Sequence, residues 1–188
     1  MPIILGFLAG VGLPIQTSVN TRLRKKVGSP FNAALVSFLV GLLFLSALLL
    51  VIGQGLHIPF AQLLNEPAWI WIGGICGVVF LTGNILLFPK LGGVQTVVLP
   101  VLGQILMGLA IDNFGLFHSQ QTPLTAFRVA GAVLVLLGVV LVSTAKESKA
   151  GRGKRQGSAG ASLWLWRAFS VFSGMAVATQ TAVNGYLG

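Results

Sequence analysis

Long apolar stretches recur along the chain and are separated by short polar or basic segments. Six of these stretches have the length that a helix needs to cross a bilayer, about 17–25 residues. They cover residues 2–21, 31–53, 68–88, 93–111, 125–144 and 163–186. None shows the alternation of apolar and polar residues that is typical of a membrane barrel strand. The pattern therefore predicts an all-α fold, a polytopic bundle of transmembrane helices.

The composition excludes an ordinary water-soluble domain. Of the 188 residues 55% are hydrophobic and only 8% are charged, and the mean hydropathy is +0.91. A soluble domain carries about 25% charged residues, and a disordered chain has low hydrophobicity. The first apolar stretch has no basic residue before it and no small-residue cleavage site followed by a soluble domain, so we expect a retained helix rather than a signal peptide.

The basic residues lie in connections on one side of the predicted bundle. Ten of the twelve follow the first, third or fifth helix: Arg22, Arg24, Lys25, Lys26, Lys90, Lys146, Lys149, Arg152, Lys154 and Arg155. The positive-inside rule assigns these connections to the cytoplasm and therefore places the N-terminus outside. Because the charges sit between apolar stretches, the net charge of +9 indicates membrane topology, and we expect no nucleic-acid partner.

The last predicted helix repeats the first. With a shift of 164 positions, six residues coincide: Gly10 with Gly174, Gln16 with Gln180, Thr17 with Thr181, Val19 with Val183, Asn20 with Asn184 and Leu23 with Leu187. The two copies are the first and sixth helices, so they cross the membrane in opposite senses. Such an inverted repeat is a recurring build of secondary transporters.

The repeat divides the chain into three parts. Residues 1–144 form a first five-helix repeat, residues 145–161 a cytoplasmic linker rich in Gly, Ser and basic residues, and residues 162–188 the first helix of a second, inverted repeat. A complete second repeat needs about four more helices. We therefore expect a truncated chain, or a natural product that borrows a partner.

Amide side chains inside the predicted helices are the candidate binding residues. Gln16 and Asn20 are four residues apart and share one helix face. A buried amide is costly unless it is hydrogen bonded. These residues either hold helices together or line a substrate cavity, with Gln180 and Asn184 as their counterparts.

Gln104 is the best single candidate for a central binding residue. It lies near the middle of its helix, one turn after Pro100. Proline removes a backbone hydrogen bond and frees the carbonyl group of Thr96. An amide beside a freed carbonyl at membrane depth is typical of transporter binding sites.

Other residues indicate packing rather than chemistry. Gly6-x-x-x-Gly10 and Gly73-x-x-x-Gly77 favour close helix approach. Asp112 and Arg128 bracket one turn and form either a pair across it or a screened surface pair. No predicted helix contains Asp or Glu, and no catalytic or metal-binding motif occurs in the sequence. We expect no catalytic residue, no metal and no cofactor, hence not an enzyme.

Three segments resemble the drug/metabolite transporter superfamily, and most closely its YdcZ-like bacterial branch. They are QTSVNTRLRKKVGSPFNAALVSFLVG (16–41), LPVLGQILMGLAIDNFGLF (99–117) and PLTAFRVAGAVLVLLGVVLV (123–142). The positions that match the pattern of this branch are Gln16, Asn20, Gln104, Asp112 and Arg128.

The resemblance implies five-helix units that are used in pairs or fused as ten helices with inverted symmetry. It implies a small-molecule exporter or permease of the bacterial inner membrane, with the lipid bilayer and a small-molecule substrate as partners. A homodimer or pairing with a second transporter half is then expected. The chain lacks the first-helix glutamate of the small multidrug exporters, so their proton coupling does not transfer. The alternative is a structural or regulatory membrane subunit that transports nothing itself.

Overall fold

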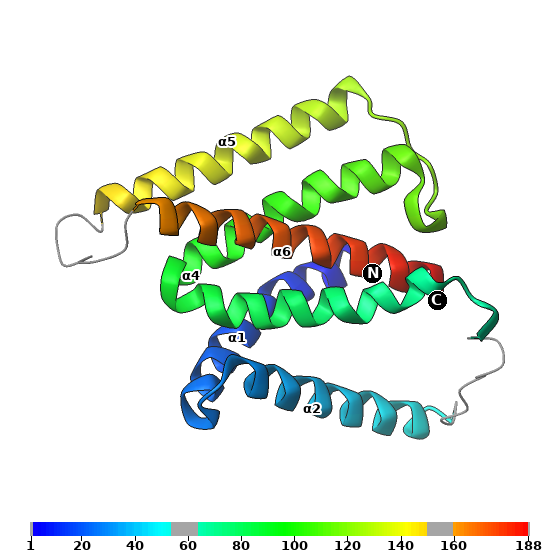
Figure 1. Ribbon diagram of the computed structural model, residues 1–188. Helices are drawn as coiled ribbons and strands as arrows, with labels where there is room; N and C mark the ends of the chain where they lie inside the picture. The colour runs from blue at the N-terminus through cyan, green and yellow to red at the C-terminus, as the bar shows by residue number, and fades with distance from the viewer. Residues whose placement is uncertain (1, 54–63, 150–159, 188) are drawn as a thin grey trace.

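The chain folds as a bundle of long helices (Figure 1). The computed structural model describes residues 2–53, 64–149 and 160–187, and these ranges contain helices and no strand. The elements in chain order are α1 (Pro2–Val27), α2 (Pro30–Val51), the 3-10 turn η1 (Ala68–Trp71), α4 (Ile72–Phe114), the 3-10 turn η2 (Leu116–His118), α5 (Ala126–Lys149) and α6 (Gly160–Leu187). The all-α expectation is confirmed.

The sharp turn between α1 and α2 follows from three consecutive residues. Gly28 has φ +74°, a left-handed conformation that ends a helix at little cost only for glycine. The Ser29 side chain accepts a hydrogen bond of 3.2 Å from the backbone N–H of Phe31 and caps α2. Pro30 then occupies the first helical position, where its missing N–H costs nothing.

Helix α4 is a hairpin of two limbs that meet at Gly92. This residue has φ 76° and ψ 168°, far from helical values, and Figure 1 shows the chain doubling back there. We call residues 72–91 the first limb and residues 93–114 the second limb. They correspond to the two predicted helices 68–88 and 93–111. A non-glycine residue at such a bend would be strained.

Helix α6 packs against both limbs at glycine positions. A β-carbon added at Gly103 would overlap the carbonyl oxygen of Val171, and one added at Gly174 would overlap the backbone of Pro100. On the first limb, small residues receive α6 side chains: Gly73 lies against Val183 and Asn184, Gly77 against Gln180, and Gly83 against Ser173. The predicted packing role of Gly73-x-x-x-Gly77 is confirmed. Gly10 has no such neighbour within 4 Å.

The outer surface of the bundle is apolar. Most of α2 is exposed, and its fully buried positions are Ala33 and Ala34. In water such a surface would drive association, whereas hydrocarbon accepts it. Two described segments have the length and hydropathy to cross a membrane, Pro30–Val51 and Ala68–Phe114, and Ala126–Leu141 is a shorter apolar helix. The six-helix topology and its sidedness remain predictions.

The helix ends gather at two poles of the bundle. The α1–α2 turn, the bend at Gly92, the end of α5 and the start of α6 lie at one pole in Figure 1. This pole carries Arg22, Arg24, Lys25, Lys26 and Lys90, and we call it the basic end. The C-terminus and the connection between α4 and α5 lie at the opposite end, and α1 and α6 run in opposite directions.

Candidate functional site

A pocket of about 330 Å³ lies between the second limb of α4 and α6, toward the opposite end from the basic residues. We call it the Gln104 pocket. The residues that line it are Gln104, Gly108, Ile111, Asp112, Ser119, Ala178, Thr181 and Ala182. Gly108 has nothing within 4 Å of an added β-carbon, so the space beside it stays open, and Ala178 and Ala182 of α6 add only small side chains to the lining.

Helix geometry directs the polar groups into this pocket. Gln104 follows Gly103, which lets α6 contact the backbone of the second limb. On α6, Ala178, Thr181 and Ala182 are three or four residues apart and share a face. The Thr181 hydroxyl donates a 2.9 Å hydrogen bond to the Val177 carbonyl, so its oxygen remains free to accept one. The lining thus offers an amide that donates and accepts, together with hydroxyl oxygens.

An ion pair lies at the edge of the pocket nearest the α4–α5 connection. Arg128 at the start of α5 pairs through Nη2 with Oδ2 of Asp112, which confirms the pairing alternative from the sequence. Arg128 Nη1 also donates to the Thr122 carbonyl at 3.0 Å, and the Thr122 N–H donates to the Asp112 carbonyl at 2.8 Å. These bonds hold the α4–α5 connection against the end of the second limb.

Aromatic side chains join the C-terminal end of α6 to η1 and η2. Trp69 lies with its ring centre 4.8 Å from that of Tyr186 and 5.4 Å from that of Phe117. The Tyr186 hydroxyl donates a 2.9 Å hydrogen bond to a carboxylate oxygen of Glu66. The sequence pattern did not predict this cluster, because its members come from three separate segments.

The five predicted binding residues fall in four places, and Asn20 occupies the fourth. Gln104 lines the pocket, and Gln180 and Asn184 lie against Gly77 and Gly73 of the first limb. Gln16 is exposed on α1.

Asn20 lies away from the pocket, at the contact between α1 and α2. It is buried, and its Oδ1 atom accepts a 2.6 Å hydrogen bond from the Ser37 hydroxyl. This hydrogen bond joins α1 to α2, which is the helix-packing role among the two alternatives for Asn20. The structure therefore does not bring the five residues together around one cavity.

Sequence reasoning missed a set of buried polar side chains on α6 and on the first limb of α4. Ser170 and Ser173 of α6 are fully buried, and Thr82 and Asn84 of the first limb are nearly so. Within the described part of the chain, Oγ of both serines, Oγ1 of Thr82 and Oδ1 of Asn84 have no hydrogen-bond partner. Unpaired buried groups are rare and mark places where water or a ligand binds. The three-residue spacing of the two serines on one helix face was the available signal.

The pocket contains no arrangement for covalent chemistry. Its one carboxylate, Asp112, is paired with Arg128, and no histidine or cysteine lines it. In the ranges that the structure describes, no group of three His, Cys, Asp or Glu side chains is placed to hold a metal ion. The arrangement is suited to reversible binding of a small polar molecule.

Comparison with known proteins agrees with this membrane architecture. The family described as "Putative inner membrane exporter, YdcZ" matches residues 1–141. The "Inner membrane protein YdcZ" of Escherichia coli (strain K12) is 32% identical over an alignment of 146 residues that covers 74% of this chain and 93% of the relative. No solved structure matches the chain. The family match includes Gln104, Asp112 and Arg128 and ends before α6.

Proposed function

Because the chain belongs to the YdcZ family of inner-membrane proteins, we propose that it is a secondary transporter that exports small drug- or metabolite-like molecules. The family description indicates an exporter of the inner membrane, and so a transporter rather than an enzyme. The finer proposal is alternating access between inverted helical repeats, with the Gln104 pocket on the substrate path.

The observation that carries this proposal is the position of Gln104. Its amide lines a space between two helices whose outward faces are apolar, and the pocket walls are Gly108, Ala178 and Ala182. An amide inside hydrocarbon is costly unless a partner satisfies it. A polar substrate supplies that partner during transport. Gln180 and Asn184, on a neighbouring face of α6, contact the substrate when the two limbs of α4 move apart.

The contrast between α1 and α6 supports the inverted repeat. Val183 on α6 is 0% exposed against α4, whereas its counterpart Val19 on α1 is 57% exposed. Gly174 touches the backbone of Pro100, whereas Gly10 has nothing within 4 Å. Gly10, Gln16 and Val19 of the repeat are thus uncovered on α1, whereas Asn20 is buried against α2.

This uncovered face favours pairing with a second transporter half. In that pair α1 packs against a helical hairpin of the second half, as α6 packs against α4 here, and Gln16 then lies where Gln180 lies in this structure. A homodimer or a separate half can supply the hairpin. The basic end faces the cytoplasm and the N-terminus lies outside, so the Gln104 pocket is nearer the outer surface.

A transport measurement with one pocket variant tests the proposal. Everted inner-membrane vesicles that contain the chain are energised and incubated with a bacterial small-molecule extract, and retained solutes are identified by mass spectrometry. We expect at least one solute to accumulate relative to vesicles without the chain. We expect Gln104→Leu to lower that accumulation by about tenfold, because the substrate loses one hydrogen-bonded partner.

Gln120→Leu is the matched control, since Gln120 is exposed on the α4–α5 connection, outside the pocket lining. It should transport like the unaltered chain. Full transport by Gln104→Leu would remove Gln104 from the site. If no solute accumulates and the chain co-purifies with another transporter half, the alternative of a structural or regulatory subunit is favoured.

A further inference from the structure

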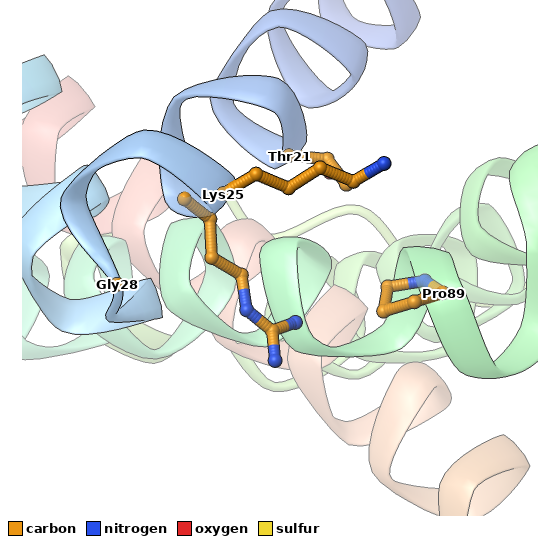
Figure 2. Close-up of a pocket in the computed structure, with 5 residues that line it drawn as sticks. Thr21, Lys25, Gly28 and Pro89 are labelled. Carbon is orange, nitrogen blue, oxygen red and sulfur yellow. The ribbon is translucent and has the colours of Figure 1, made fainter.

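A second pocket lies at the basic end of the bundle, far along the helices from the Gln104 pocket. It has a volume of about 370 Å³ and is lined by Thr21, Arg24, Lys25, Gly28 and Pro89. Figure 2 shows Thr21 and Lys25 on the last turns of α1 and Gly28 just after it, with Pro89 of α4 across the opening. We call it the basic pocket.

Of the two cations of the basic pocket, Arg24 is held in place by a backbone carbonyl and Lys25 is exposed. Nη1 of Arg24 donates a 3.2 Å hydrogen bond to the Ile85 carbonyl, which orients the guanidinium group and leaves other N–H donors free. The carboxylates whose surroundings the structure describes, Glu66 and Asp112, bond to Tyr186 and Arg128. Neither Glu66 nor Asp112 therefore neutralises Arg24 or Lys25.

The other residues that line the basic pocket offer a ligand no further hydrogen-bond donor. The Thr21 hydroxyl donates to the Thr17 carbonyl at 2.7 Å, and the Gly28 N–H donates to the Arg24 carbonyl at 2.9 Å. Pro89 has no N–H. The donors of this pocket are therefore a guanidinium fork and an ammonium group, a combination that suits the tetrahedral oxygens of a phosphate.

We propose that the basic pocket binds a phosphate group, and that the phosphate belongs to the headgroup of an anionic phospholipid in the cytoplasmic leaflet. Basic pockets between helices on this side of a membrane bind anionic headgroups, and the surrounding cations of the basic end raise the local concentration of anionic lipid.

The exposed apolar side chains of α1 that a lipid in the same leaflet can reach are Ile15 and Val19. They are 60% and 57% exposed and lie about 15 Å and about 9 Å along the helix from Lys25, within the half-thickness of the hydrocarbon core. A headgroup held by Lys25 therefore has apolar side chains of α1 within reach of its acyl chains, which a free phosphate does not use.

Binding of phosphatidylglycerol to the purified chain tests this site. The chain in neutral detergent is titrated with the lipid and the complexes are counted by native mass spectrometry, with salt near 0.15 M so that charges more than about 8 Å away are screened. Arg24→Gln with Lys25→Gln should weaken binding by about 30-fold, since each basic residue at the surface contributes roughly a factor of five. Lys25→Gln alone, at an exposed position that does not endanger folding, should weaken it by about fivefold.

The matched control is Arg22→Gln with Lys26→Gln, which removes the same charge from the same helix but leaves the pocket lining intact. We expect a loss clearly smaller than that of the pocket variant, about fivefold, because Arg22 and Lys26 attract the headgroup from a distance but do not line its pocket. Equal weakening in both double variants, or none in either, would overturn the proposal. Displacement of the lipid by millimolar inorganic phosphate would overturn the lipid source and assign the pocket to free phosphate. This experiment measures lipid binding and not transport. A negative result would therefore overturn the lipid site without bearing on the proposed transport function.

Discussion

Replacing Gly174 with valine is expected to separate α6 from α4 and to lower the melting temperature of the protein by roughly 10 °C. A side chain at this position has no space, because its first carbon already overlaps the backbone of Pro100. Backbone atoms cannot move aside as a flexible side chain can, so the helices must part. Their separation also exposes Ser170 and Ser173, which are fully buried on α6.

Gly185→Val is the control for this prediction. Gly185 lies on the same helix and has nothing within 4 Å, so the substitution creates no clash, and valine is no poorer a helix former than glycine. Thermal unfolding in detergent, followed by tryptophan fluorescence, measures both variants. If Gly174→Val unfolds within about 2 °C of Gly185→Val, a difference that amounts to less than about 1 kcal/mol, the close contact of α6 with the second limb is wrong.

Reversing the charge of Asp112 is expected to destabilise the protein by about 2 kcal/mol, between the values for exposed and buried ion pairs. Asp112→Arg removes the partner of Arg128 and sets two cations side by side at the end of the second limb. Both side chains are about one third exposed, so water screens part of the repulsion. Loss of the pair also weakens the hydrogen bond from Arg128 Nη1 to the Thr122 carbonyl.

The combination Asp112→Arg with Arg128→Asp should recover most of the lost stability, because the swap restores one cation and one anion at the same contact. The same thermal unfolding measurement gives the coupling between the two sites. If the double variant is as unstable as the sum of the single variants, the two side chains do not interact in the folded protein. Arg128→Asp alone completes the cycle.

The helices could be predicted from the sequence, but their packing could not. Length and hydropathy place the six helical stretches, and Gly92 marks the bend between the limbs of α4. In a soluble helix the apolar face indicates the buried face, whereas here apolar residues surround each helix and lipid accepts them as well as a neighbour does. Gly103 of α4 contacts α6, and Gly174 of α6 contacts α4. These contacts depend on which helices lie side by side, and hydropathy does not indicate which helices do so.

Of the residues that line the candidate site, the sequence predicted Gln104 as a binding residue. Gln104 is recognisable because it is an amide one turn after Pro100 within an apolar helix. Thr181 and Ser119 come from distant segments, so spacing along the chain could not place them beside it.

Gln180 and Asn184 illustrate the other limit of the sequence. The four-residue spacing shows that they share a face of α6, but it does not show toward which limb of α4 that face turns. They lie against the first limb, whereas Thr181, one residue after Gln180, faces the pocket on the second.

The central claim is that α6 is the inverted counterpart of α1 across the membrane, and single-cysteine labelling tests it most directly. With Cys76 replaced by alanine, Asn32→Cys marks the turn after α1 and Gly185→Cys marks the end of α6, both at exposed positions. A membrane-impermeant maleimide is added to spheroplasts. The account predicts that Gly185→Cys is labelled at once and that Asn32→Cys is labelled only after permeabilisation. Labelling of both positions from the same side would contradict the inverted arrangement.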